Sequence, residues 1–210
     1  MDRLEEISRA LQQGDEETVS ALTRAALEEK RSAREVLEGG LIAGMDVVGD
    51  RFRAHEVFLP DVLLAARAMI AGMEVLRPVL LADRVPSRGK VVIGTVQGDL
   101  HDIGKNLVGV MLRGAGFDVI DLGSDVSPEG FVDAALENEA RLIGMSALLT
   151  TTMPVMRRVV ALLSERGLRD RIRVIVGGAP VSTDFAREIG ADSYAYDAAN
   201  AVQRVEDLLR

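Results

Sequence analysis

The sequence lacks cysteine and tryptophan, contains two histidines, and has aromatic residues at only 3% of its 210 positions. The absence of cysteine excludes disulfide bonds and every metal site that needs thiolate ligands. A zinc site built by the protein alone is also disfavoured, because zinc usually takes three or four Cys, His or carboxylate ligands. With so few aromatic side chains the core must be aliphatic, which suits packed helices and buried parallel strands better than an all-β sandwich.

Basic residues are fewer than acidic ones, 25 against 33, which gives a formal net charge of -8. This balance, together with the lack of a basic stripe, argues against nucleic-acid binding. No apolar run is long enough to span a bilayer, and the first residues, MDRLEEISRA, have the charged pattern of a helix rather than of a signal peptide. We therefore expect a cytoplasmic protein, whose 48% hydrophobic content is ample for a buried core.

The N-terminal part is predicted to form a bundle of four helices. Residues 2–13 and 16–30 are rich in Leu, Ala, Glu and Arg, and Gly14 and Asp15 between them provide a stop and a cap. A third helix is predicted from about Ser32 and a fourth from about Pro60, a favourable residue for a first turn. Their apolar faces recur at three- and four-residue steps: Leu37, Leu41, Met45, Val48 and Phe52 on the third, and Val62, Leu63, Ala66, Met69, Ile70, Met73 and Leu76 on the fourth.

The segment Pro78–Gly89, PVLLADRVPSRG, separates this helical pattern from the rest of the chain. Its two prolines, serine and glycine predict a linker, and therefore a helical cap domain over residues 1–84 and an α/β domain over residues 89–210. We expect the linker to act as a hinge between them.

After residue 89 short apolar runs alternate with helical patterns, which predicts a parallel sheet covered on both faces. Ser127, directly before Pro128, is a natural helix N-cap. The predicted strands are Lys90–Val96, Asp118–Leu122, Arg141–Ser146, Arg173–Val176 and Ser193–Ala195, and the predicted helices are Ile103–Arg113, Pro128–Glu137, Pro154–Arg166, Ser182–Ile189 and Ala198–Leu209. This is the flavodoxin-like or Rossmann-like class.

The stretch GDLHDIGKN, Gly98–Asn106, follows the first predicted strand. Asp99 precedes His101 by two residues, and Gly104 follows it by three, where the chain must turn into a helix and let something bulky approach. The spacing D-x-H-x-x-G suits a single histidine ligand to a metal that another framework already holds. Since His55 lies far away in the helical region, a cofactor such as a haem or a corrin would have to supply most of the ligands. The simpler alternative is an ordinary polar residue in a loop.

Three segments fall at the carboxyl ends of predicted strands, the edge where such sheets bind ligands. They are Asp99–His101, the run of small and hydroxyl residues Ser146–Thr152, and Gly177–Ser182, where two glycines let a ligand approach the backbone. Each alone is consistent with ordinary loops and caps. Together they predict a slot for a nucleotide-like tail.

With these motifs the chain resembles the corrinoid proteins of cobalamin-dependent methyltransferase systems, which are similar to the cobalamin-binding region of methionine synthase. The resemblance covers essentially the whole chain. It rests on GDLHDIGKN, SALLTTTM and VGGAPVS in the α/β part, and on Gly44–Met45, Val48–Gly49, Phe52, Phe58–Pro60 and Ala65–Met69 in the helical part. The signal is specific because order, spacing and the helical region agree at once.

The resemblance implies that cobalamin, as methylcobalamin or another corrinoid, binds with its own dimethylbenzimidazole base displaced and with His101 as the lower cobalt ligand. Asp99 would hydrogen-bond the far ring nitrogen of His101, and Thr152 would extend this relay where methionine synthase has serine. Phe58 and Leu59 match the lid that shields the methyl group. The other implied cofactor contacts are Gly98, Leu100, Asp102, Ile103, Gly104, Ser146, Leu148, Thr150, Gly177, Gly178 and Ala179.

The implied function is that of a corrinoid carrier. It accepts a methyl group on Co(I) from a substrate-specific methyltransferase and passes it to a second methyltransferase, which acts on a thiol or pterin acceptor. A reductive activase is a further implied partner. Because the sequence shows no nucleophile and base in a recognisable catalytic arrangement, we expect a non-catalytic subunit of a multi-component methyl-transfer system.

Three alternatives remain at this point. The small cobalamin-binding subunit of an adenosylcobalamin-dependent mutase would share the histidine motif but would not need the helical region. A cobalamin-responsive regulator would share both domains but should add a DNA-binding element. A cofactor-free flavodoxin-like interaction protein is the generic alternative.

Overall fold

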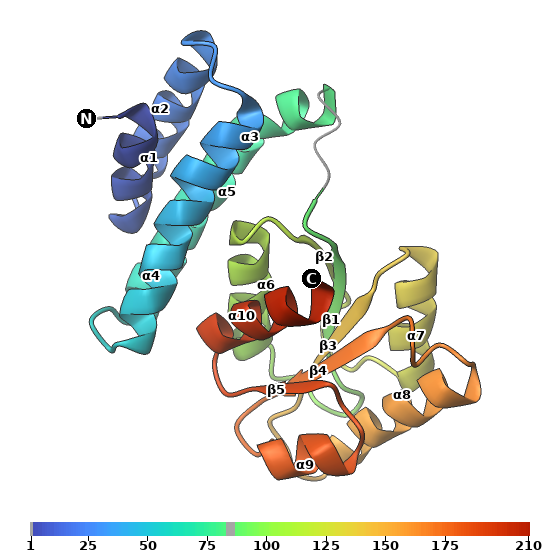
Figure 1. Cartoon of the computed structure of the whole chain (residues 1–210). Coiled ribbons are helices and arrows are strands. Elements are labelled where there is room, and N and C mark those ends of the chain that lie inside the picture. The colour runs from blue at the N-terminus through green and yellow to red at the C-terminus, as the bar shows by residue number, and fades with distance from the viewer. Residues whose placement is uncertain (1, 83–86) are drawn as a thin grey trace. The chain divides into compact units, whose positions relative to one another are not determined.

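The computed structural model describes residues 2–82 and 87–210, which divide into two compact units. The first, called here the helical unit, comprises Met1–Ser87 with Gly114–Gly116, and the second, the α/β unit, comprises Arg88–Arg113 with Phe117–Arg210 (Figure 1). The predicted domain end at residue 84 and the middle of the predicted hinge, residues 83–86, lie outside the described residues.

The helical unit contains the predicted helices. Asp15 caps the second of them, because its carboxylate accepts a hydrogen bond from the backbone N–H of Thr18 (3.0 Å). Ser32 and Glu35 form a reciprocal capping box at the start of the third. The elements are α1 (Arg3–Gln12), α2 (Glu16–Glu28), α3 (Ala33–Glu35) continuing through the π-helical segment η1 (Val36–Ile42) into α4 (Ala43–Arg53), and α5 (Leu59–Ala82).

The π-helical segment changes which side chains the third helix buries. Leu41 and Met45 are buried as predicted, but Val36 is fully buried while Leu37 is only half-buried. A π-helical turn contains more residues than an α-helical turn, so the buried face shifts along the sequence. Regular α-helical periodicity could not anticipate this shift.

The predicted start of the linker at Pro78 is wrong, because α5 continues through Pro78 to Ala82. A proline inside a helix removes one hydrogen bond to the carbonyl four residues earlier. Leu76, which precedes Pro78 by two residues, is fully buried. Leu63 and Ile70, predicted on the inner face, are 44% and 43% exposed. Neither α5 nor any other helix within residues 2–82 and 87–210 is long and apolar enough to cross a membrane.

The α/β unit is built on a parallel sheet with the strand order β2-β1-β3-β4-β5. The predicted strands and helices are confirmed to within one or two residues, and Ser127 caps its helix by accepting from the N–H of Gly130 (3.1 Å). The strands are β1 (Lys90–Thr95), β2 (Asp118–Asp121), β3 (Leu142–Ser146), β4 (Arg173–Gly177) and β5 (Ser193–Ala195), and the helices are α6 (Ile103–Gly114), α7 (Pro128–Glu137), α8 (Met153–Glu165), α9 (Thr183–Glu188) and α10 (Ala198–Leu209).

Helices cover both faces of this sheet (Figure 1). α6 and α10 lie on one face, and α7 and α8 lie on the other. The fully buried Phe131, Ile143 and Met156 belong to a hydrophobic core between the sheet and α7, α8 and α9. Because helices enclose both faces, a ligand has access to the sheet mainly at its edges, and parallel strands direct their carboxyl ends to one of these.

Candidate cofactor-binding site

The strand order places a topological switch point between β1 and β3. The chain leaves β1 toward β2 on one side and leaves β3 toward β4 on the other. In open α/β sheets the crevice that forms where the order reverses is the usual ligand site. The loop after β1 carries Asp99 and His101, and the loop after β3 carries Leu148, Leu149 and Thr152. Two of the three predicted segments therefore meet at this point.

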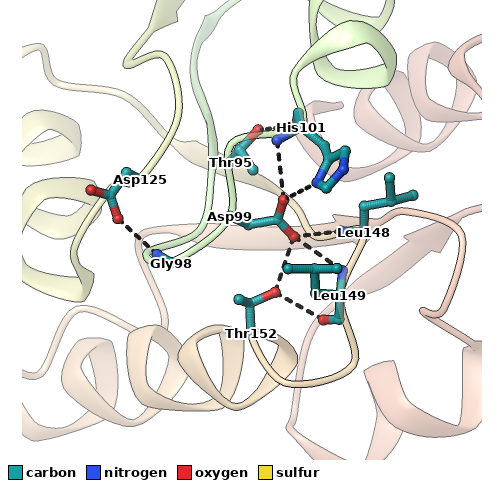
Figure 2. Close-up of polar contacts among 8 residues, drawn as sticks. All are labelled: Thr95, Gly98, Asp99, His101, Asp125, Leu148, Leu149 and Thr152. Carbon is teal, nitrogen blue, oxygen red and sulfur yellow. Dashed lines mark hydrogen bonds and ion pairs between the residues drawn. The ribbon is translucent and has the colours of Figure 1, made fainter.

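Asp99 ties these two loops together (Figure 2). Its side chain is fully buried, and its Oδ2 accepts hydrogen bonds from the backbone N–H groups of Leu148 (2.7 Å) and Leu149 (3.1 Å). The hydroxyl of Thr152 lies 3.0 Å from the same oxygen. The other carboxylate oxygen of Asp99, Oδ1, lies 3.1 Å from the backbone N of His101 and 2.7 Å from its Nδ1. One carboxylate thus organises both sides of the switch point.

The hydrogen bonds to Asp99 also set its charge. Burial alone would raise the pKa of the carboxyl group, because the charged form loses solvation. The N–H of Leu148, the ring and N–H of His101 and the N–H of Leu149 outweigh burial and hold the pKa well below its usual value. Asp99 is therefore an anion at neutral pH.

The anion determines how His101 presents its ring. With Asp99 at Nδ1, the hydrogen of the neutral imidazole resides on Nδ1 and donates to the carboxylate, so Nε2 carries the lone pair. The side chain is 53% exposed. The loop backbone beneath it is held as well, because the hydroxyl of Thr95 donates to the carbonyl of His101 (2.9 Å). This is an oriented, accessible imidazole of the kind that ligates a metal.

Thr152 lies where the predicted relay needs it. Its Oγ1 is 3.0 Å from Asp99 Oδ2 and 2.8 Å from the carbonyl of Leu149. The single hydroxyl hydrogen can be donated to only one of these oxygens at a time. The structure thus brings Asp99, His101 and Thr152 together, while their roles toward a cofactor stay predictions.

Apolar side chains are exposed around the imidazole. Leu100 and Ile103, on either side of His101 in sequence, are each 74% exposed. Leu148 and Leu149 across the switch point are also exposed. Tyr196 follows β5 on the same edge of the sheet and is exposed too, although the sequence analysis did not select it. Apolar surface gathered at a switch point favours a bound ligand that covers it.

The structure gives different reasons for a glycine at each of the predicted glycine positions. A Cβ on Gly104 would meet no atom within 4 Å, so the protein itself leaves this position open. Gly178 has a φ of +123°, and its Cβ would lie 1.9 Å from the backbone oxygen of Ala147. The fold therefore requires Gly178 whether or not a ligand approaches it. Gly177 lies near Ala195, whose oxygen would be 3.0 Å from a Cβ there.

The remaining predicted residues are divided between the two units. Ser146 ends β3 half-buried, and Thr150 and Ala179 are exposed in the loops after β3 and β4. The predicted positions Gly98 and Asp102 are exposed in the loop of His101. Phe58 and Leu59 belong to the helical unit and are exposed there. Their place over a cofactor stays a prediction.

Three charged residues near the site were missed by the sequence analysis. The side chain of Lys105 is almost fully buried, and its Nζ lies 2.6 and 2.7 Å from the two carboxylate oxygens of Asp121. Asp125 accepts a hydrogen bond from Gly98 N–H (2.7 Å). Lys105 lies within the GDLHDIGKN motif, and both aspartates follow or end β2, so their positions at the sheet edge were the signal that could have found them.

The donor set fits a metal that brings its own ligands. Within the described ranges, no group of three His, Cys, Asp or Glu side chains is placed to hold a metal ion. His101 offers one nitrogen, with exposed apolar side chains beside it and open space at Gly104. A macrocyclic metal cofactor matches this combination, because it supplies the equatorial ligands and a large apolar surface.

Comparison with known protein families points to one such cofactor. A family described as "B12 binding domain" matches residues 89–206, and a second family with the same description matches residues 3–77.

The relatives found match all or nearly all of the chain. It is 44% identical to corrinoid protein DSY3155 of Desulfitobacterium hafniense over 100% of this chain and 98% of the relative. It is 44% identical to dimethylamine corrinoid protein 1 of Methanosarcina mazei over 98% of this chain and 95% of the relative. A chain in the crystal structure of the methanol:cobalamin methyltransferase complex MtaBC from Methanosarcina barkeri matches with a TM-score of 0.88 and 32% identity, covering 99% of this chain and 79% of that one.

Proposed function

The chain belongs to the family of B12-binding corrinoid proteins, and from this premise we propose that it is the carrier subunit of a methyl-transfer system. The carrier accepts a methyl group from a substrate-specific methyltransferase and delivers it to a second methyltransferase, which acts on a thiol or pterin acceptor. A reductive activase is a third partner in this proposal. When bound, the corrinoid supplies a cobalt ion that can gain and lose a methyl group.

The single observation that carries the proposal is the Asp99–His101 pair at the switch point. Asp99, buried and ionised, holds Nδ1 of His101 at 2.7 Å, so Nε2 would be available to ligate the cobalt. A carboxylate behind a ligating histidine fixes the ring orientation and raises its basicity. Thr152 at the far oxygen of Asp99 can adjust how much of the negative charge the imidazole feels.

The loops around this pair provide the rest of the binding surface. Leu100, Ile103, Leu148 and Leu149 lose exposed apolar area when a corrin covers them, which favours binding by about 25 cal/mol for each Å² removed from water. The open space at Gly104 admits a bulky group beside the start of α6. In this proposal the residues that would contact the nucleotide tail are Gly98, Asp102, Ser146, Thr150 and Gly177–Ala179.

We propose that the exposed Phe58 and Leu59 of the helical unit act as a lid that shields the reactive centre of the cofactor. An apolar lid excludes water from a reactive centre. It must also move away when a partner needs access, which is a gating role.

The relatives support methyltransferases as partners without selecting one methyl donor. One is named for dimethylamine, and another is a chain from a methanol:cobalamin methyltransferase complex. Because relatives named for different methyl donors are all similar to this chain, we propose that the donor is chosen by the partner enzyme rather than by this chain. The family match over residues 3–77 favours the carrier over the small mutase subunit, which would not need that region.

The proposal is tested by loading the full chain with methylcobalamin and recording absorption spectra of wild type and His101→Ala. Wild type is expected to show a histidine-ligated cofactor, and the variant a spectrum without that ligand. His55→Asn is the matched control, since the exposed His55 is the second of the two histidines and asparagine tolerates its φ of 58°. Identical spectra for wild type and His101→Ala would exclude His101 as the ligand.

The direction of transfer needs a second assay. Loaded protein, reduced to Co(I), is mixed with a candidate methyltransferase and methanol or dimethylamine, and methylation is followed spectroscopically. The methylated protein is then given a thiol acceptor with a second methyltransferase. Methyl transfer in both steps supports the carrier role, and rearrangement activity of an adenosyl form would replace it with the mutase alternative.

A further inference from the structure

Asp125 holds the backbone of the histidine loop from the side opposite to Leu148 and Leu149 (Figure 2). Its carboxylate Oδ1 accepts a hydrogen bond from Gly98 N–H (2.7 Å), and its own N–H donates to the carbonyl of Asp99 (3.1 Å). The two bonds bracket the peptide that joins Gly98 to Asp99. The proposed function gives this residue no role.

Asp125 can act as a clamp because its own loop is held firmly. The N–H of Thr95 donates to the carbonyl of Gly123 (2.9 Å), and the N–H of Val126 donates to the carbonyl of Thr95 (3.0 Å). Asp121, paired with the buried Lys105, accepts from Gly123 N–H (2.9 Å). The β2–α7 connection is thus fastened to β1 and to α6 before Asp125 reaches Gly98.

The backbone at both ends of the clamp is unusual. Gly98 has a φ of +83°, and Asp125 has a φ of +58°, a left-handed conformation that costs a side-chain-bearing residue about 1 kcal/mol. This conformation lets the side chain and N–H of Asp125 face the same neighbouring loop. The observed contacts offset its cost.

We propose that Asp125 is a positioning residue for the His101 ligand, an inference that rests on the proposed function. Two sets of contacts position His101. Leu148, Leu149 and Thr152 hold the carboxylate of Asp99, whereas Asp125 holds the backbone from which Asp99 and His101 project. Without the acceptor oxygen of Asp125, the Gly98–Asp99 peptide can rotate. The His101 ring is then no longer held in the single orientation that directs Nε2 toward the cofactor.

The test uses full-length protein loaded with cobalamin and reduced to the paramagnetic Co(II) form. Isotopically labelled histidine separates the protein imidazole from the cofactor's own base in the electron paramagnetic resonance spectrum. Asp125→Asn keeps an acceptor oxygen and suits the left-handed backbone, so it should retain wild-type ligation. Asp125→Gly keeps the N–H and relieves the backbone but has no acceptor, so the ratio of ligated to unligated imidazole should fall about fivefold, the effect of one hydrogen bond.

Two controls separate positioning from loss of folding. Asp192→Ala removes an equivalent carboxylate, which accepts from Val174 N–H (2.7 Å) at the other edge of the sheet, and should leave ligation unchanged. If Asp125→Gly does not fold, Asp125→Ser takes its place, because its hydroxyl is too short to reach Gly98 in the same way. Folding of each variant is checked by urea unfolding.

The outcomes distinguish this inference from the function it rests on. Wild type without imidazole ligation would contradict the proposed role of His101 itself. Wild-type ligation that persists in Asp125→Gly or Asp125→Ser would overturn the positioning role while leaving the proposed function intact. Equal loss in Asp125→Asn and Asp125→Gly would also overturn it, since the retained oxygen should rescue the geometry.

Discussion

The two edges of the sheet use the same device, an aspartate that accepts a hydrogen bond from a backbone amide, in different surroundings. At the amino edge, Asp192 accepts from Val174 N–H and faces Arg169 (2.7 Å) and Arg173 (3.2 Å). At the carboxyl edge, Asp99 is fully buried and faces backbone amides, a hydroxyl and the imidazole of His101.

The difference lies in what neutralises each carboxylate. At the amino edge two arginines satisfy the charge, and the contacts simply join neighbouring segments. At the carboxyl edge no arginine is among the hydrogen-bond partners found for Asp99 in the described part of the chain, and the charge acts on a histidine whose second nitrogen is free to bind. An aspartate therefore has a purely structural role at the amino edge and belongs to the candidate binding site at the carboxyl edge.

The largest expected effect on stability comes from replacing a glycine at the carboxyl edge, compared with replacing one at the amino edge. Gly178→Ala at the carboxyl edge adds both backbone strain and a Cβ against the oxygen of Ala147, so the free energy of unfolding should fall by about 3 kcal/mol or more. Gly167→Ala at the amino edge also has a positive φ, but no atom within 4 Å of the new Cβ, so its cost should be about 1 kcal/mol. Urea unfolding of the cofactor-free proteins measures both, and equal losses would contradict the close approach at Gly178.

The second effect compares the two aspartates directly. Asp99→Asn places an amide against the donors that face the buried carboxylate, so it should cost about 2–3 kcal/mol of unfolding free energy. Cobalamin affinity should fall about 10–100-fold, the usual effect of losing the partner behind a ligating histidine. Asp192→Asn loses partly exposed ion pairs and should cost about 1 kcal/mol.

Titration with cobalamin and urea unfolding test this pair. Unchanged cobalamin affinity in Asp192→Asn is the required control. If Asp192→Asn weakened cobalamin binding as much as Asp99→Asn, the contrast between the edges would be lost.

A third effect concerns the pH dependence of stability. Because the pKa of Asp99 is lower in the folded protein than in the unfolded chain, its stabilisation is fully present above the ordinary carboxyl pKa of about 4. It is lost as pH falls below that value toward the folded pKa. The unfolding free energies of wild type and Asp99→Asn should therefore converge as pH falls below about 5. A difference that does not change down to acid unfolding would show that the charge of Asp99 contributes no stability.

The smallest effect on stability is expected at Gly104. Alanine there meets no atom within 4 Å and suits a helix, so the cofactor-free protein should change by less than about 1 kcal/mol in either direction. Cobalamin loading should nevertheless be weaker, because the methyl group occupies space left for the cofactor. Wild-type loading of Gly104→Ala would place the cofactor elsewhere on this edge.

Much of the fold followed from local pattern. Apolar runs between helical stretches predicted all five strands, and Ser127–Pro128 predicted a helix start, because both signals depend on neighbours in sequence. The errors occurred where the structure departed from local preference. Pro78 stayed within α5, and the π-helical segment shifted the buried face of the third helix.

The candidate site was predicted only in part, for the same reason. Asp99 and His101 are two residues apart, so their pairing was accessible from the motif. Lys105 with Asp121, and Gly98 with Asp125, join residues 16 and 27 positions apart, and no local pattern indicated either contact.

The amino-acid sequence by itself determined the alternation of strands and helices, the single histidine motif and the shortage of other Cys and His ligands for a metal, since these depend on residue type and short spacing. Only the tertiary structure decided the order β2-β1-β3-β4-β5, which brings the loops after β1 and β3 together. It also decided that a glycine is needed at position 178, beside the backbone of Ala147, and that Asp125 reaches Gly98. Contacts between distant segments depend on how the whole chain packs, and that packing is a collective result that no short stretch of sequence contains.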